Sequence, residues 1–212
     1  MNSKPMKVLT LPVGQMQTNC YIAIDEKSGK AVVIDPGDDA DYIMRRIQDE
    51  QADLQYIIAT HGHFDHIMAV TELKLAYNIP FLIHENDLVI LRRHKKTAQY
   101  FLNIEVLPPP PPDSFIKESM KITFGETHLH VLETPGHTPG SICLYDGEHT
   151  LFSGDTIFAQ GNVGRTDLDG GDQAQLYRSI RSKILPLPDH TIVFSGHGES
   201  TILQEERKYY EE

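Results

Sequence analysis

The sequence predicts an α/β fold in which β-sheets are covered by helices. Strand-like and helical segments alternate through both halves of the chain, an order that favours covered sheets over a helical bundle or a bare β-sandwich. The 212 residues, 40% hydrophobic and 23% charged, can bury a sizeable core. No linker and no strong internal repeat divides the chain, so we expect residues 1–212 to form one domain.

The first half alternates short apolar runs with longer amphipathic segments. Apolar and β-branched runs bounded by turn residues predict strands at 6–11, 19–25, 31–35, 54–60 and 79–84. Apolar residues at helical spacing predict helices at 38–51, 65–77 and 85–93. Each of these helices follows a strand, which is the order expected where a helix packs back onto a sheet.

The second half begins after a proline tract. Five consecutive prolines, 108–112, cannot form a helix and predict an extended, stiff connector. Strands separated by glycine-containing turns follow at 120–124, 127–133, 141–146 and 150–153. A helix at 173–184, a strand at 191–195 and a closing helix at 202–210 complete the pattern.

Charge and composition exclude several classes of function. Thirty acidic against nineteen basic residues give a net charge of −11, which repels phosphate backbones, so we expect no nucleic-acid partner. No apolar run approaches the ~20 residues of a membrane span, and the N-terminal residues contain no signal-peptide core. Cys20 and Cys143 lack CxxC spacing and are expected to be small buried residues in a reducing compartment. These features predict a cytoplasmic protein with no membrane partner.

The segment 60–66 (THGHFDH) carries the strongest chemical signal. Four metal-capable side chains, His61, His63, Asp65 and His66, occur within six positions where a predicted strand ends. In extended chain His61 and His63 point the same way, and the turn into the next helix moves the other two to the neighbouring side. One loop can therefore serve two adjacent metal ions.

Three further ligand-type residues follow predicted strands and adjoin glycine: His137, Asp155 and His197. Binding sites in α/β proteins gather at such strand ends. Five histidines and two aspartates are too many for one four-coordinate zinc and fit two metals that share a bridging ligand. Nitrogen and oxygen donors suit zinc, iron or manganese. We expect the other six histidines to be solvated or packed; they are His84, His94, His128, His130, His149 and His190.

These motifs, in this order, resemble the metallo-β-lactamase superfamily, whose pattern is H-x-H-x-D-H followed by a His, an Asp and a last His. The segments 18–21 (TNCY), 33–37 (VIDPG), 134–141 (TPGHTPGS), 164–167 (GRTD) and 195–198 (SGHG) are similar to its short glyoxalase II-like, or hydroxyacylglutathione hydrolase-like, branch. The resemblance implies a four-layer αβ/βα sandwich of two mixed β-sheets flanked by helices, with the site at the edge between the sheets.

The resemblance also implies a role for each site residue. His61, His63 and His137 would bind one metal, Asp65, His66 and His197 the other, and Asp155 would bridge them. Asp35 would orient a ligand histidine, and Arg165 would meet the thiol-bearing half of the substrate. The implied cofactors are two divalent ions, zinc first, with iron or manganese as alternatives.

The implied activity is hydrolysis of a small-molecule thioester of the hydroxyacylglutathione type. A hydroxide bridging the two metals would attack the thioester carbonyl, with Asp65, His66 and Asp155 as the catalytic residues. Full-length glyoxalase II has a helical C-terminal domain that contacts glutathione, and this chain ends soon after His197, so the use of glutathione itself is left open. The sequence is compatible with a monomer or a homodimer.

Other functions share this set of residues. A persulfide dioxygenase on the same fold would hold one iron with His61, His137 and Asp155, although the segment 197–201 (HGEST) favours the hydrolase branch. Lactonases and phosphodiesterases also share the ligands. A metal-binding module without turnover is disfavoured by the complete bridging set.

Overall fold

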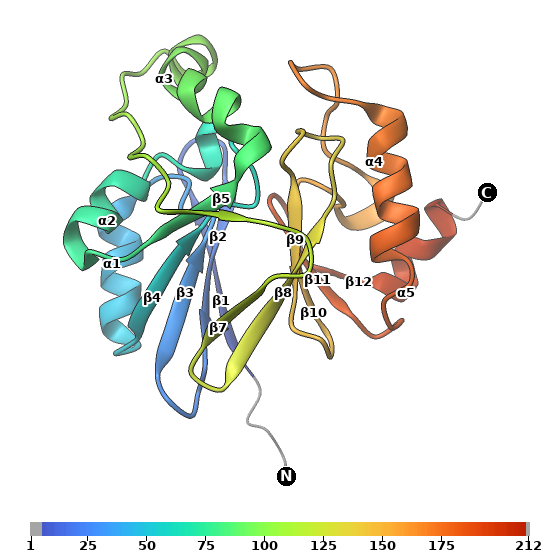
Figure 1. The fold of residues 1–212 in the computed structure, drawn as a ribbon, viewed down its shortest axis with the longest axis horizontal. Coiled ribbons are helices and arrows are strands. Elements are labelled where there is room, and N and C mark those ends of the chain that lie inside the picture. Colours follow the sequence, from blue (N-terminus) through green and yellow to red (C-terminus); the bar gives the residue numbers. More distant parts are fainter. Residues whose placement is uncertain (1–5, 211–212) are drawn as a thin grey trace.

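The computed structural model describes residues 6–210 and consists of two six-stranded mixed sheets with five helices in that range (Figure 1). The first sheet contains, in spatial order, β1 (Lys7–Val13), β2 (Thr18–Ile24), β3 (Lys30–Ile34), β4 (Asp53–Ile58), β5 (Phe81–His84) and β6 (Ser114–Ile116). The second contains β12 (Thr201–Ile202), β11 (Ile192–Ser195), β10 (Thr150–Gly154), β9 (Ile142–Tyr145), β8 (Thr127–Glu133) and β7 (Lys121–Phe124). The helices are α1 (Ala40–Asp49), α2 (Val70–Tyr77), α3 (Leu88–Leu102), α4 (Gln173–Ser179) and α5 (Leu203–Glu206).

Both sheets combine antiparallel and parallel pairs. In the first, β1, β2 and β3 are antiparallel neighbours, and β3 through β6 run parallel. In the second, β7 through β10 are antiparallel, β10 and β11 are parallel, and β12 closes the edge antiparallel to β11. The parallel pairs bring the carboxyl ends of β3, β4 and β5 to one end of the first sheet, where ligand-type residues follow them.

Three apolar clusters separate four layers. Between the sheets, Val32 and Ile58 of the first sheet pack in one cluster with Leu129 and Phe152 of the second. The outer face of the first sheet is covered by α1 and α2, and that of the second by α4 and α5 (Figure 1). Strands such as β2, β3 and β9 therefore bury alternate side chains on opposite faces, as the period of two requires. The predicted αβ/βα four-layer sandwich is confirmed.

Two helices differ from the expected boundaries because tertiary contacts decide them. The helix expected at 65–77 is a 3₁₀ turn, Phe64–His66, followed by α2 only from Val70. The helix expected at 85–93 extends to Leu102, since Leu91, His94 and Ala98 form a buried stripe at helical spacing through a charged surface run. The expectation that it ends at 93 was wrong.

The end of the chain and two short strands also differ. The closing helix expected at 202–210 is reduced to α5 and a 3₁₀ turn, Arg207–Tyr209, and its first residue belongs to β12. Neither β12 nor β6 was predicted, because strands of two or three residues carry almost no pattern. The prolines 108–112 form a connector, as expected, and it leads from α3 to β6. Thr71 Oγ1 donates a hydrogen bond to the Pro108 carbonyl at 2.8 Å.

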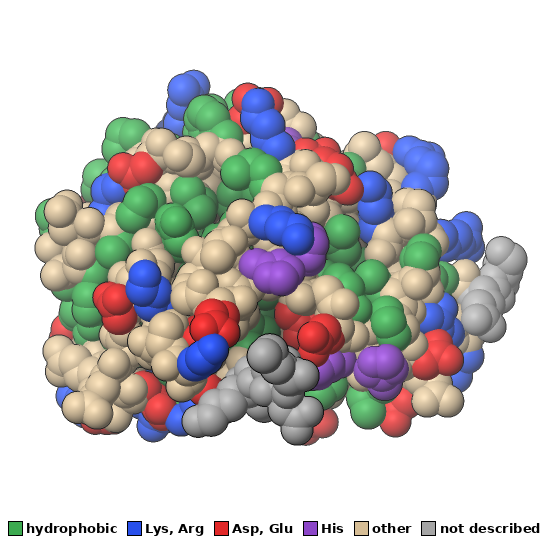
Figure 2. Space-filling view, turned by 60° about the horizontal axis from the view of Figure 1, so that its bottom comes forward, with side chains coloured by type: hydrophobic (Ala, Val, Ile, Leu, Met, Phe, Trp, Pro, Cys, Tyr) green, Lys and Arg blue, Asp and Glu red, His purple; other side chains and the backbone are tan. Residues whose placement is uncertain are grey.

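Within residues 6–210 no helix is long and apolar enough to cross a membrane. Cys20 and Cys143 are fully buried free thiols, as predicted. The end of the molecule that Figure 2 brings forward shows acidic and basic side chains interspersed, without one continuous basic face.

Candidate metal centre

The ligand-rich segment lies directly after β4. Asp35, directly after β3, fixes the first residue of this segment through two hydrogen bonds. Thr60 N–H donates to Asp35 Oδ1 and Thr60 Oγ1 donates to Asp35 Oδ2, each at 2.7 Å. The chain then bends at Thr60 and His61, is extended at His63 and turns at Phe64–His66. The predicted change of direction after His63 is therefore made by a 3₁₀ turn rather than by the start of a helix.

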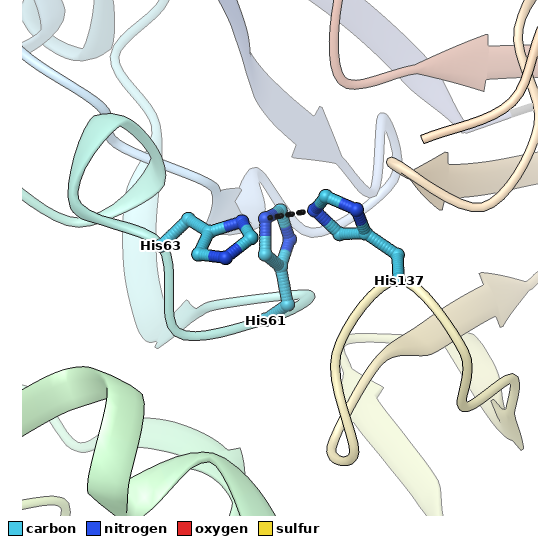
Figure 3. Close-up of side chains that lie close together, drawn as sticks. All are labelled: His61, His63 and His137. Atoms are coloured by element: carbon cyan, nitrogen blue, oxygen red, sulfur yellow. Dashed lines mark hydrogen bonds between the residues drawn. The ribbon is translucent and has the colours of Figure 1, made fainter. Parts of the chain in front are cut away.

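A first cluster contains three histidines from two sheets. His61 and His63 follow β4, and His137 follows β8; their rings face one another (Figure 3). The Nε2 atoms of His61 and His137 lie 3.2 Å apart, and the three ligand nitrogens all lie within 4.8 Å of one another. Three convergent imidazoles of this kind could hold a metal ion.

A second cluster contains Asp65, His66 and His197. Asp65 Oδ2 lies 3.4 Å from His197 Nε2 and 3.8 Å from His66 Nε2. Their ligand atoms also lie within 4.8 Å of one another. Asp155, at the end of β10, lies between the clusters, with Oδ1 3.4 Å from His66 Nε2 and Oδ2 3.5 Å from His137 Nε2. The structure thus brings all seven sequence-predicted residues into one place.

Hydrogen bonds orient three of the histidines in the same way. The Nδ1–H groups of His61, His66 and His137 donate to Thr60 Oγ1 at 3.1 Å, Asp35 Oδ2 at 2.9 Å and the Arg165 carbonyl at 2.7 Å. Each bond leaves Nε2 free to face the centre. Fixing one ring nitrogen so that the other is presented as a ligand is the usual outer-shell arrangement of metal-binding histidines.

Two atoms at the centre are buried without a hydrogen-bond partner: His66 Nε2 and Asp155 Oδ1. Buried polar atoms are paired in the great majority of cases, so an unpaired nitrogen 3.4 Å from an unpaired carboxylate oxygen requires an explanation. A divalent ion would satisfy both. The nitrogen and oxygen donors present therefore fit a metal centre.

The two clusters differ in their electrostatics. Burial and the neighbouring imidazoles lower the pKa of His63 to about 4 and hold that of His61 well below its usual value. Burial also opposes the charged form of His66, but carboxylates, Asp155 foremost, raise its pKa to about 10. Burial therefore keeps His61 and His63 neutral in the first cluster, whereas the carboxylates around His66 favour its charged form in the second.

The N-terminal motif TNCY anchors the His197 loop. Asn19 Nδ2 donates to the carbonyl oxygens of Ser195 and Gly198, each at 2.9 Å, and Tyr21 Oη donates to Ser195 O at 2.5 Å. Thr18 Oγ1 donates to Asp65 Oδ2 at 3.3 Å. The motif thus ties β2 to both ends of the second cluster.

A cavity of about 360 Å³ opens onto the centre. Its walls are largely apolar, with Met16, Phe64, Phe101, Phe158 and Leu168 among the lining residues. Arg165 also lines it, but its guanidinium is held by Asp167 through bonds of 2.8 and 2.7 Å. The cavity can hold a small molecule with its reacting group at the clusters.

Sequence reasoning missed two contributors. Phe101 was outside the predicted helix, and only the full length of α3 brings it to the cavity. Asp87, which is fully buried, bonds to the loops on both sides of the first cluster, yet it stands in an unremarkable polar segment. Within residues 6–210 none of the other six histidines belongs to a group that could hold a metal ion.

Two helix-covered mixed sheets with a histidine- and aspartate-lined site at their shared end define an α/β sandwich with a candidate binuclear centre. The family model described as the metallo-β-lactamase superfamily matches residues 13–197, and the chain belongs to that superfamily.

Curated relatives place it more closely. Hydroxyacylglutathione hydrolase GloC of Haemophilus influenzae is 34% identical over 207 residues, which cover 96% of this chain and 96% of that protein. The hydroxyacylglutathione hydrolase of Bdellovibrio bacteriovorus is 35% identical over 178 residues, 84% of this chain and 62% of that protein. These relatives support the glyoxalase II-like branch.

Solved structures share the whole fold. The B3 metallo-β-lactamase BLEG-1 has a TM-score of 0.88 at 37% identity, covering 95% of this chain and 97% of that one. TTHA1623 in a di-iron-bound form has a TM-score of 0.85 at 34% identity, covering 94% of this chain and 97% of that one. ETHE1 from Myxococcus xanthus has a TM-score of 0.81 at 27% identity, covering 97% of this chain and 83% of that one.

Proposed function

We propose that this protein is a binuclear metal-dependent hydrolase that cleaves small-molecule thioesters of the hydroxyacylglutathione type. The observation that carries the proposal is the pair of three-residue clusters with Asp155 between them. Two hydroxyacylglutathione hydrolases among the relatives support the substrate class. We propose zinc as the metal, with iron or manganese as alternatives, since the donors are nitrogen and oxygen and a di-iron form of a similar protein exists.

We propose that His61, His63 and His137 hold one ion, that Asp65, His66 and His197 hold the other, and that Asp155 contacts both. Bound divalent ions would supply a hydroxide nucleophile at neutral pH and polarise the carbonyl that it attacks. Asp35 fixes the His66 ring through its bond to Nδ1 and so keeps Nε2 directed at the centre.

The chain's own residues select and place the substrate. The apolar cavity wall excludes water from the reacting group and accommodates the acyl half of a thioester. Arg165 lines the same cavity and is the cation available to an anionic thiol half, once it exchanges its contact with Asp167. Asp65, which accepts from Thr18 and lies 3.4 Å from His197, is placed to hold a proton released during the attack.

The test combines metal content with two activities on the same purified protein. About two metals per chain, hydrolysis of S-lactoylglutathione and no oxygen uptake with glutathione persulfide are expected from the two-metal arrangement. Hydrolysis should disappear after chelation and return with the metal. Two bound metals without cleavage of any thioester would rule out the substrate class while leaving the metal centre in place.

The second candidate is a mononuclear iron persulfide dioxygenase, favoured by the likeness to ETHE1. Its three ligands would be His61, His137 and Asp155, and these do converge, with His137 Nε2 3.5 Å from Asp155 Oδ2. His197→Ala separates the two functions. The hydrolase requires the second cluster and loses activity, whereas a one-iron dioxygenase retains oxygen uptake.

A further inference from the structure

Asp87 is a buried carboxylate that lies outside both clusters. It ends the 3₁₀ turn between β5 and α3, and it is 0% exposed. It accepts three hydrogen bonds: from Gly62 N–H at 2.7 Å, from Thr138 Oγ1 at 2.7 Å and from Gly140 N–H at 2.6 Å. No water-facing role is open to a group so enclosed, so its function lies in what it connects.

The three donors come from the two loops that carry the first cluster. Gly62 lies between His61 and His63, in the loop after β4 of the first sheet. Thr138 directly follows His137, in the loop after β8 of the second sheet. One carboxylate therefore bonds to the backbone between two of the histidines and to the residue next to the third.

The neighbouring glycines show how close this approach is. A Cβ at Gly140 would lie 2.6 Å from Asp87 Oδ1, and one at Gly62 would lie 3.1 Å from the Asp87 carbonyl oxygen. Neither glycine has a positive φ, so the backbone conformation does not call for glycine at either position. At Gly140 the contact with the carboxylate leaves no room for a side chain, and at Gly62 the contact with the Asp87 main chain is close.

We propose that Asp87 is a positioning residue that sets the separation of the His61–His63 and His137 loops and thereby the metal affinity of the first cluster. The inference rests on the proposed metal centre. Metal ligands must be held within a few tenths of an ångström, and these histidines approach from different sheets. A carboxylate that accepts from both loops at once fixes that distance.

Asn at position 87 keeps the shape but not the acceptors. If its oxygen faces Gly62 and Thr138, its amide group meets the Gly140 N–H; if it is turned, the amide meets the Gly62 N–H. In the first case the His137 loop keeps only its Thr138 bond, and in the second the Gly62 loop loses its single bond to residue 87. Asp87→Asn is therefore expected to loosen one of the two loops without emptying the core.

The chain contains a matched control at the other end of the sheets. Asp25, 3% exposed, accepts from Ser28 N–H at 2.8 Å in the turn after β2 and from Glu126 N–H at 2.9 Å and Thr127 Oγ1 at 2.8 Å in the β7–β8 turn. It also joins the two sheets through a buried carboxylate, but it touches no candidate ligand. Asp25→Asn reports the stability effect alone.

The experiment is a competitive zinc titration of the metal-free full-length chain against a chelating dye, with urea unfolding of each variant. Asp87→Asn is expected to weaken zinc binding about 10–100-fold, the range of outer-shell substitutions. Asp25→Asn is expected to lower the unfolding free energy but to leave zinc affinity within about twofold, because distant sites act independently. Equal zinc affinities in the two variants would overturn the proposal.

A milder pair keeps the test decisive if Asp87→Asn does not fold. Thr138→Val removes one donor to Asp87, and Thr127→Val removes the corresponding donor to Asp25. Zinc binding should weaken about threefold or more in the first and stay unchanged in the second, from the loss of one hydrogen bond. Unchanged binding in Thr138→Val refutes the role of Asp87. These readouts do not depend on thioester hydrolysis, so the substrate assignment can fail while this inference stands.

Discussion

The two ends of the sandwich are built alike and differ in how completely their polar atoms are paired. At one end Asp25 receives hydrogen bonds from turns of both sheets, with bonds to each of its oxygens. At the other end Asp87 joins two loops in the same way, and the metal-ligand clusters at that end contain two buried, unpaired atoms, His66 Nε2 and Asp155 Oδ1. A buried carboxylate that joins two loops is therefore a structural device common to both ends, and the convergent, unpaired histidine and carboxylate atoms distinguish the candidate site.

The glycines repeat the comparison. A Cβ at Gly125 would lie 2.8 Å from Asp25 Cγ, so the Asp25 end is as tightly built as the Asp87 end. A Cβ at Gly196 would lie 2.2 Å from Asp155 Oδ1 and 2.8 Å from His66 Cε1. Close packing is common to both ends. At the second end it also encloses two ligand-type atoms, His66 Nε2 and Asp155 Oδ1, that have no hydrogen-bond partner.

The largest expected effect follows from removing the carboxylate between the clusters. Asp155→Ala should reduce kcat/KM for S-lactoylglutathione by at least about 100-fold, since even outer-shell changes reach that size. Metal content should fall from about two ions per chain to one or fewer, because Asp155 faces histidines of both clusters. Steady-state kinetics and elemental analysis of the same sample measure both.

Asp25→Ala is the control for that prediction. It makes the same chemical change at the other end and should retain both metals in the folded fraction. If Asp155→Ala kept full metal content and activity, the unpaired Oδ1 would have no functional meaning.

Metal removal is expected to have the next largest effect. A ligand present at about 1,000 times its Kd stabilises the folded state by about 4 kcal/mol, which corresponds to about 8–16 °C in Tm for a chain of this size. Chelation should lower the Tm of the wild type and of Asp25→Asn by the same amount, and that of Asp155→Ala much less. Calorimetry with and without a chelator tests this. Equal shifts in all three proteins would place the metal elsewhere.

The ionised Asp25 carboxylate should stabilise the fold at neutral pH and lose this effect in acid. Burial opposes the charged form, but hydrogen bonds from Thr127, Ser28 and Glu126 lower the pKa of Asp25 from 3.8 to about 2. Because the pKa is lower in the folded chain, the stabilisation is present above pH 4 and is lost as the pH falls through 2. It amounts to about 2 kcal/mol, so Asp25→Asn should lower the unfolding free energy by about that at pH 7.

The measurement is urea unfolding of the metal-free protein from pH 7 downwards. The difference between wild type and Asp25→Asn should narrow below pH 4. A difference that stays constant into acid would show that the bonds of Asp25 act through geometry alone.

The same comparison explains how much was predictable from the sequence. Four ligand-type residues within 61–66 have few explanations other than metal binding, and His137, Asp155 and His197 are marked by glycine at strand ends. The alternation of strands and helices predicted sheets covered by helices, and the resemblance to the superfamily implied the four-layer order. The sequence was sufficient wherever a single segment contained all the residues on which a prediction depended.

Long-range contacts were not predictable in this way. Asp87 and Asp25 look like ordinary polar turn residues, since their partners are up to 102 positions away. The extent of α3 depended on a buried stripe hidden within a charged run, so Phe101 could not be assigned to the cavity. The residues that were missed have partners from distant parts of the chain, which only the folded arrangement of the two sheets brings together.

The smallest expected effect concerns the exposed ion pair at the cavity mouth. Arg165 is 51% and Asp167 68% exposed, so water and salt already weaken their attraction. Asp167→Asn frees the guanidinium for an anionic substrate. The KM for S-lactoylglutathione should fall about two- to threefold with kcat unchanged, as expected for an exposed pair.

The control substrate is the lactoyl thioester of uncharged N-acetylcysteamine, whose KM should not change. Asp169→Asn is the control variant: Asp169 pairs with Arg93, which does not line the same cavity as Arg165. The gain in Asp167→Asn should vanish in high salt, since it arises from an exposed charge. An equal fall in KM for both thioesters would mean that Asp167 acts by shaping the loop. The thiol half of the substrate would then bind without Arg165. A KM that stays low in high salt would lead to the same conclusion, because salt weakens an interaction between exposed charges but not a change in the shape of the loop.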